Sequence, residues 1–151
     1  MSELPTGPFI QAALFAEVIL EDKTGTLSVI RIIDRFTHVV QGQSPPENLP
    51  PFTRQLNTLI SLKPGKAMGR QDFTLTMEKP DTHREAVAQG SFNFAGGRNQ
   101  GVNLRLVLHV TIDQEGIYFF DFEIDEHILT RMPLEVIYQR VVATGQPPEA
   151  P

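Results

Sequence analysis

The 151-residue sequence contains no cysteine, which excludes disulfides, thiolate metal sites and cysteine nucleophiles together. It also has no excess of basic charge: its formal net charge is -5, and its 13 Lys and Arg residues are scattered along the chain. A polyanion is therefore a disfavoured partner, and we expect no nucleic-acid binding. Long apolar runs are missing as well, and the first twenty residues do not follow the pattern of a secretory signal. We accordingly expect a cytoplasmic protein that does not enter a membrane.

Sequence motifs for catalysis and cofactor binding are also missing. There is no G-x-S-x-G elbow, no Rossmann glycine pattern and no P-loop, and the glycine-bearing segment KPGKAMGR lies between expected strands. The four histidines are far apart in sequence and lack the spacing of a zinc site. We therefore expect neither enzymatic activity nor a bound cofactor.

Proline marks the organisation of the chain. Prolines cluster near both ends and in the segment QGQSPPENLPPF at 41–52, which is best interpreted as an extended connection, and a crossover between two sheets would fit it. The length suits a single domain. We divide the chain into an N-terminal tail (1–10), a β-domain (11–142) and a C-terminal tail (143–151).

Alternation of apolar and polar residues predicts strands through most of this domain. It is strongest at 101–112 and 117–124, which we expect to pair as an antiparallel hairpin across the turn at 113–116. A further strand follows around Leu134 and Val136. Near the start, AALFAEVIL and TLSVIRII flank a turn that ends in Gly25 and predict a second hairpin. The apolar phase slips at Val29 and Ile30, which indicates a β-bulge or a strand buried on both faces.

The middle of the chain adds three shorter strands. These are RQLNTLISLK, which also fits an amphipathic helix, followed by QDFTLTME and GSFNFAG. The total is seven to eight strands with little or no helix. The fold class that we expect is all-β, a two-sheet antiparallel β-sandwich of immunoglobulin-like or C2-like Greek-key type.

Two stretches carry a resemblance to a known family. AALFAEVILEDKTGTLSVIRIIDR is a hairpin, and GIYFFDFEIDEHILTRMPLEVIY contains G-x-Y-x-F-x-x-x-x-D followed by L-T-R-x-P-L-x-V. In these stretches, about a third of the chain, the sequence resembles an uncharacterised family of short bacterial proteins. The resemblance implies a bacterial, single-domain, cytoplasmic protein, and it implies no catalytic residues.

Apolar residues on strand faces that we expect to be exposed to solvent suggest an interface. Ile117 and Phe119 lie opposite the main apolar face of their strand, as do Val107 and Ile137 on theirs. If the last three strands form one sheet, these four residues make an apolar patch with Arg105 and His109 at its rim. A tail or the proline-rich loop folded over this face would explain the same residues.

Two weaker candidates concern ligands. Asp121, Glu123 and Asp125 alternate onto one strand face and could bind a hard cation such as calcium, although a solvated surface explains them more simply. The loop FAGGRNQG, with Gly96, Gly97, Arg98 and Asn99, could form a mobile contact element.

The leading functional hypothesis is a non-enzymatic protein-interaction or assembly module that binds another protein or its own copy. The alternative is a β-sandwich that binds a small ligand or calcium.

Overall fold

The computed structural model describes residues 6–96 and 100–143, and every regular element in these two ranges is a β-strand. The strands are β1 (Phe9–Glu21), β2 (Leu27–Ile33), β3 (Arg35–Gly42), β4 (Phe52–Lys63), β5 (Gly69–Glu78), β6 (Arg84–Phe94), β7 (Val102–Ile112), β8 (Gly116–Ile124) and β9 (His127–Val142). The prediction of an all-β fold is confirmed, and the segment that also fitted a helix is the strand β4. The described part of the chain has no helix with the length and hydrophobicity needed to cross a membrane.

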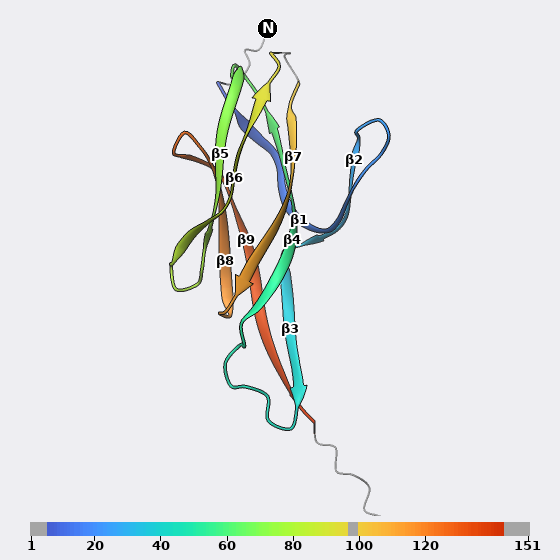
Figure 1. The fold of residues 1–151 in the computed structure, drawn as a ribbon, viewed down its shortest axis with the longest axis vertical. Helices are drawn as coiled ribbons and strands as arrows, with labels where there is room; N and C mark the ends of the chain where they lie inside the picture. The colour runs from blue at the N-terminus through green and yellow to red at the C-terminus, as the bar shows by residue number, and fades with distance from the viewer. Residues whose placement is uncertain (1–5, 97–99, 144–151) are drawn as a thin grey trace, which may run out of the picture.

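The strands form two sheets, a four-stranded sheet in the order β2-β1-β4-β7 and a five-stranded sheet in the order β3-β9-β8-β5-β6 (Figure 1). The described chain thus has nine strands where seven to eight were expected. The strand that sequence analysis missed is β3, whose inward positions include His38 beside Phe36, so its apolar alternation is weak. This strand pairs with β9 in parallel, which departs from the expected antiparallel arrangement.

One hydrophobic core lies between the two sheets. Phe15 of β1 meets Phe120 of β8 with their ring centroids 4.9 Å apart, which joins the two layers directly. Most of the alternating residues that sequence analysis placed inside are buried, among them Leu75, Leu108 and Leu134, whereas those in the first half of β7 are only partly buried. Burial of these faces is the main driving force for folding in a domain of this size.

The predicted hairpin between 101–112 and 117–124 is wrong. The strand β7 belongs to the four-stranded sheet and β8 to the five-stranded sheet, so the turn at 113–116 carries the chain across the core. The Tyr118 hydroxyl holds this turn: it accepts hydrogen bonds from the backbone N–H groups of Asp113 and Gln114 and donates one to the Gln114 carbonyl. Two strands that each have one apolar face can bury these faces as neighbours in one sheet or as members of two sheets that face each other across a core. Alternation of apolar and polar residues does not distinguish these two arrangements.

The proline-rich segment is a crossover between the sheets, as the sequence suggested. It leads from β3 in the five-stranded sheet to β4 in the four-stranded sheet. Leu49 anchors it in the core, and the Tyr138 hydroxyl donates a hydrogen bond of 2.7 Å to the Pro46 carbonyl.

The strand β1 is shared between two partners along its length. Its first half pairs with β4 and its second half pairs with β2, so the β1–β2 hairpin stands away from the rest of the molecule (Figure 1). Asp22 closes the hairpin loop by accepting hydrogen bonds from the N–H groups of Thr24 and Thr26, and Gly25 supplies a φ of +83°. The predicted N-terminal hairpin is therefore confirmed. Its first strand begins at Phe9, inside the expected tail, and β9 ends at Val142.

Candidate interaction surface

The six predicted interface residues do not form one patch. Val107, with Arg105 and His109, lies on β7 in the four-stranded sheet, whereas Ile117, Phe119 and Ile137 lie on β8 and β9 in the five-stranded sheet. The prediction assumed one sheet for the last three strands, and this assumption is wrong because the turn at 113–116 crosses the core.

Arg105 links β7 to β1 and does not form part of a polar rim around an apolar patch. Its Nη1 lies 3.0 Å from Glu21 Oε2, and its Nη2 donates a hydrogen bond of 3.1 Å to the Ile19 carbonyl. Asn57 of β4 donates a further hydrogen bond of 2.8 Å to the Glu17 carbonyl. These contacts hold the second half of β1 against the outer side of the four-stranded sheet, where Ala16, Ile19 and Leu59 form a small second core.

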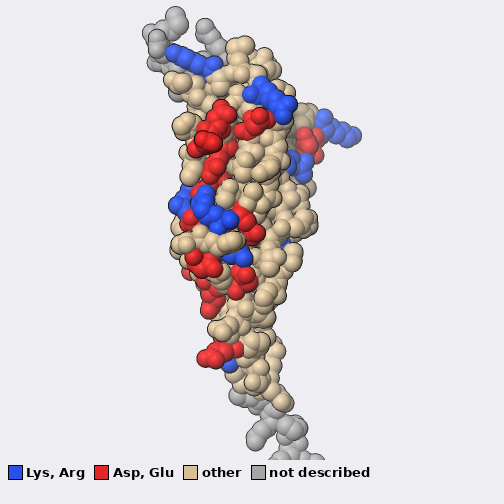
Figure 2. Space-filling model, turned by 60° about the vertical axis from the view of Figure 1, so that its left-hand side comes forward, with Lys and Arg blue, Asp and Glu red and all other residues tan. Residues whose placement is uncertain are grey.

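The outer face of the five-stranded sheet carries a charge cluster, which we define as Glu78, Arg84, Asp121, Glu123 and Arg131. Asp121 at its centre is 0% exposed, with Arg84 Nη1 2.9 Å from one carboxylate oxygen and Arg131 Nε 3.3 Å from the other. Arg84 also contacts Glu78 and Glu123, and Arg131 contacts Glu78. Figure 2 shows basic side chains surrounded by acidic ones on this side of the molecule.

Electrostatics inside the charge cluster follow from these contacts. The hydrogen bond from Arg84, together with the charge of Arg131, lowers the pKa of Glu78, and hydrogen bonds to Glu78 and Asp121 raise the pKa of Arg84. Arg131 also lies over the Phe119 ring, 4.2 Å from its centroid. The face that was predicted to be apolar at Phe119 is thus a mixed surface of ion pairs and one arginine-covered ring.

Two of the three predicted cation ligands form ion pairs with these arginines. Asp121 and Glu123 contact Arg84, and Asp125 lies in the β8–β9 turn with a φ of +50°. Among the residues that the structure describes, no group of three or more His, Asp or Glu side chains is placed to hold a metal ion. The simpler interpretation of a solvated face is also wrong for Asp121, which is fully buried.

The glycine loop that was proposed as a contact element is only partly described. Gly96 has a φ of +91°, which suits glycine, whereas Gly97, Arg98 and Asn99 lie outside the described residues.

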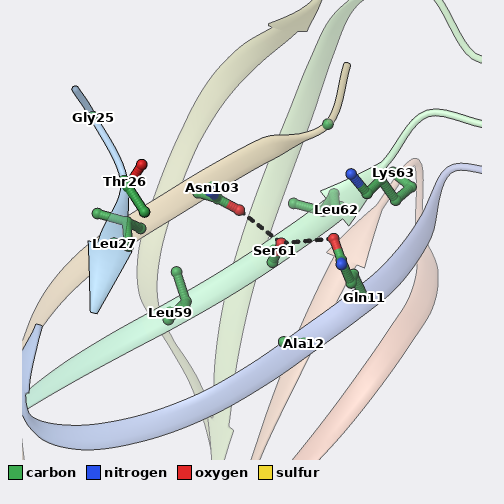
Figure 3. A pocket seen from close by; sticks show the side chains of 11 residues that line it. Gln11, Ala12, Gly25, Thr26, Leu27, Leu59, Ser61, Leu62, Lys63 and Asn103 are labelled. Atoms are coloured by element: carbon green, nitrogen blue, oxygen red, sulfur yellow. Dashed lines mark hydrogen bonds between the residues drawn. The ribbon is translucent and has the colours of Figure 1, made fainter. Parts of the chain in front are cut away.

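A polar groove lies between the tip of the β1–β2 hairpin and the four-stranded sheet, with a volume of about 590 Å³. On its floor Ser61 donates a hydrogen bond of 2.7 Å to Asn103 Oδ1 and lies 3.4 Å from Gln11 Oε1, so one polar row crosses β1, β4 and β7 (Figure 3). Leu27 and Leu59 form its apolar side. Sequence analysis did not find this site, because its residues come from four strands.

The side of the hairpin that faces away from the second core is apolar and exposed. Val18 and Ile30 lie directly opposite each other in the strand register, and Leu20 and Ile32 each lie two residues further along their strands. Exposure is 39% for Val18, 50% for Leu20, 43% for Ile30 and 65% for Ile32. We call these four residues the hairpin patch.

The hairpin patch also borders an open strand edge. The strand β2 ends the four-stranded sheet, so β1 is its only neighbour in the part of the chain that the structure describes. The sequence held a signal for this surface: TLSVIRII has apolar residues on both faces. We interpreted this as a bulge or a doubly buried strand. The register with β1 shows no shift, but the pairing skips Glu17 and Arg31, and Arg31 has a φ of +58°, so β2 is irregular there. Only one of the two faces of β2 is covered.

Fold and surface together define a single two-sheet all-β domain whose outward features are an exposed hairpin and a charged sheet face. The chain belongs to DUF6941, a family of unknown function, whose sequence model matches residues 11–137. This match confirms the resemblance to an uncharacterised family. No curated protein matches the sequence.

Two of the similar solved structures are distant likenesses. A β-glucosidase from Listeria innocua in complex with glucose has a TM-score of 0.42 and 12% identity, over 61% of this chain and 16% of the glucosidase. The alkylpurine DNA glycosylase AlkC from Pseudomonas fluorescens, bound to DNA with an abasic site analog, has a TM-score of 0.33 and 11% identity, over 66% of this chain and 27% of that protein. These likenesses are too weak to support any statement about function.

Proposed function

We propose that this chain is a non-enzymatic β-sandwich module of the bacterial cytoplasm that binds a partner protein through its β1–β2 hairpin. The observation that carries the proposal is the hairpin patch beside the open edge of β2. Contiguous exposed aliphatic residues on a soluble domain are typical of interaction sites.

The open edge supports this proposal independently of the apolar side chains. An edge strand presents backbone N–H and C=O groups that can pair with another strand, and proteins that do not use such edges usually blunt or cover them. Addition of a partner strand to a free edge is a common mode of protein recognition. On β2 the edge and the patch lie on one element, so a single partner segment can satisfy both.

Three of the charged and polar side chains in the fold already have structural partners, which supports a non-enzymatic role, although the fully buried Thr58 hydroxyl has no hydrogen-bond partner among the described residues. Asp121 binds two arginines, the Tyr118 hydroxyl holds the 113–116 turn, and Arg105 braces the hairpin. Each side chain is committed to a contact that stabilises the fold, whereas a catalytic group must be free to meet a substrate.

Differential capture tests the proposal. A tagged chain carrying Ile30→Asp should lose the partner that the wild-type chain retains from extracts of its native cells, because a charge in the middle of the hairpin patch must be desolvated on binding. The matched control is Ile117→Asp, the same change at a residue of similar exposure on the five-stranded sheet (47% against 43%).

The control separates the two candidate faces. We expect Ile117→Asp to retain the partner and Ile30→Asp to lose it, with both variants melting near the wild-type temperature, since exposed substitutions usually change stability by less than about 0.5 kcal/mol. If Ile117→Asp loses the partner and Ile30→Asp retains it, the proposal is contradicted and the interface lies on the five-stranded sheet. The captured protein is identified by mass, so capture of an untagged copy of this chain would reveal self-association.

Small-ligand binding is a second candidate function, and the polar groove favours it. Its volume lies in the range of ligand sites, and the amide nitrogens of Gln11 and Asn103 have no hydrogen-bond partner among the described residues. Screening of neutral fragments by NMR should shift the signals of Gln11 and Asn103, and the shifts should disappear in Asn103→Ala. Fragments that shift only residues outside the groove would remove this candidate.

A further inference from the structure

The β1–β2 hairpin packs on the outer side of the four-stranded sheet through the small second core. Ala16, Ile19 and Leu59 are its buried residues, and Leu27 and Val29 of β2 are packed against them while remaining partly exposed. The main core between the two sheets is far larger. A contact that buries few apolar side chains opens at a lower cost in free energy than a main core does. The hairpin can therefore separate from the sheet while the rest of the molecule stays folded.

Backbone pairing is interrupted at the point where the hairpin leaves the sheet. The strand β1 pairs with β4 as far as Ala16, and the ladder between β1 and β2 omits Glu17 and Arg31 and resumes at Val18. Arg31 has a φ of +58°, which is unusual for a residue other than glycine. We define Glu17 and Arg31 as the hinge, because a change of backbone dihedral angles there moves the hairpin without breaking the ladder beyond it.

Beyond the hinge, one side chain of the sheet holds the hairpin by polar contacts. Arg105 of β7 lies 3.0 Å from Glu21 and donates a hydrogen bond of 3.1 Å to the Ile19 carbonyl. Among the described residues, no other hydrogen bond or ion pair joins 18–30 to the sheet. The side chains of Arg105 and Glu21 are 43% and 49% exposed, so solvent screens the ion pair and its contribution to stability is small.

The polar groove is built from residues on both sides of this hinge. Gly25, Thr26 and Leu27 belong to the hairpin, whereas Ser61 and Asn103 belong to the sheet (Figure 3). A movement of the hairpin about the hinge separates these two sets of residues. The groove is therefore complete only when the hairpin lies against the sheet.

From this geometry we infer that the β1–β2 hairpin is a lid on the polar groove, which turns about the hinge as a unit and is held closed by Arg105. The inference goes beyond the proposed partner binding and gives the groove a means of entry. A molecule in contact with both the hairpin and the sheet stabilises the closed lid, because a ligand favours the state that it binds more tightly. Segments that close over a bound molecule are common in proteins with such sites.

Thiol labelling at single introduced cysteines measures the opening of the lid, since the chain has no cysteine of its own. Leu59→Cys places a thiol under the hairpin, and Leu108→Cys places one in the main core; the two leucines are 8% and 2% exposed. We expect the thiol at position 59 to react at least about tenfold faster than the thiol at position 108, because the first needs only the lid to open and the second needs the core to unfold.

Arg105→Gln, introduced into both cysteine variants, tests whether this arginine holds the lid closed. We expect the reaction at position 59 to accelerate about twofold to fivefold, which is the effect that the loss of one exposed ion pair allows, and the reaction at position 108 to stay the same. The matched control is Arg70→Gln, which removes an exposed ion pair of the same length, 3.0 Å, with Asp72 on β5. It should change neither rate.

Amide hydrogen exchange distinguishes a lid that turns as a unit from a hairpin that frays. A lid keeps its own ladder when it opens, so the amides that pair β1 with β2 beyond the hinge should stay protected while the thiol at position 59 reacts. Arg105→Gln should leave the exchange of these amides unchanged.

Three results would overturn the inference. These are equal reaction rates at positions 59 and 108, no effect of Arg105→Gln at position 59, and exchange of the ladder amides as fast as the reaction at position 59. None of them concerns the partner, because the capture experiment with Ile30→Asp depends on the exposed side of the hairpin and decides the proposed function separately.

Discussion

Asp121 is a fully buried carboxylate on the outer side of a sheet, and two arginines cover it. Arg84 and Arg131 each contact one of its oxygens while remaining partly exposed themselves. Removing one partner from a buried ion pair is costly because the other charges lose their compensation. The sequence predicted that Asp121 lies outside the core, but it could not show that arginines from β6 and β9 close over it.

Asp121→Asn tests the role of the charge cluster. We expect a loss of about 2 kcal/mol in the free energy of unfolding, less than for a fully buried pair because the arginines are partly exposed. Urea unfolding measures it, with Glu123→Gln as the control, since Glu123 makes a single longer contact of 3.4 Å with Arg84. Equal losses in the free energy of unfolding for the two substitutions would show that the burial of Asp121 adds no stability beyond that of an exposed ion pair.

Strands were easier to predict than their partners. Alternation identified the inward faces of β5, β7 and β8, since one side of each strand packs in the core. It did not show that β7 and β8 lie in different sheets, because an apolar face can be buried beside a strand or across the core. The short strand β3 was missed because a histidine stands at one of its inward positions.

The β1–β2 hairpin depends on its loop, and Asp22 gives that loop a dependence on pH. Hydrogen bonds from the Thr24 hydroxyl and from the N–H groups of Thr26 and Thr24 lower the pKa of Asp22 below 3.8. A carboxyl with a lowered pKa stabilises the folded form above its unfolded pKa, and this contribution is lost as the pH falls through the folded pKa.

We therefore expect the hairpin to loosen below about pH 4 before the core does. Amide hydrogen exchange of β2 measured against pH should accelerate in the wild-type chain, relative to β8, and the added acceleration should be absent in Asp22→Asn. The same pH profile for wild type and variant would show that Asp22 does not control the loop.

At the scale of the whole molecule, the two sheets bury one core and leave two different outer surfaces. The five-stranded sheet presents a charge cluster in which arginines pair with carboxylates, whereas the hairpin presents aliphatic residues and a strand edge that is unpaired among the described residues. The sequence was sufficient for the all-β class, the proline-rich crossover and the family. The exposed apolar surface was misplaced because it depends on which face of β2 remains uncovered, and this is a property of the tertiary structure.

Photo-crosslinking in the native cells is the most direct test of the hairpin as the interaction surface. A photoreactive side chain is placed at Ile32, the most exposed residue of the hairpin patch, and in a second variant at Ile117 on the five-stranded sheet. We predict a single adduct of defined mass from position 32, abolished by Ile30→Asp, and none from position 117. An adduct from position 117 with none from position 32 would contradict the account and place the interface on the five-stranded sheet.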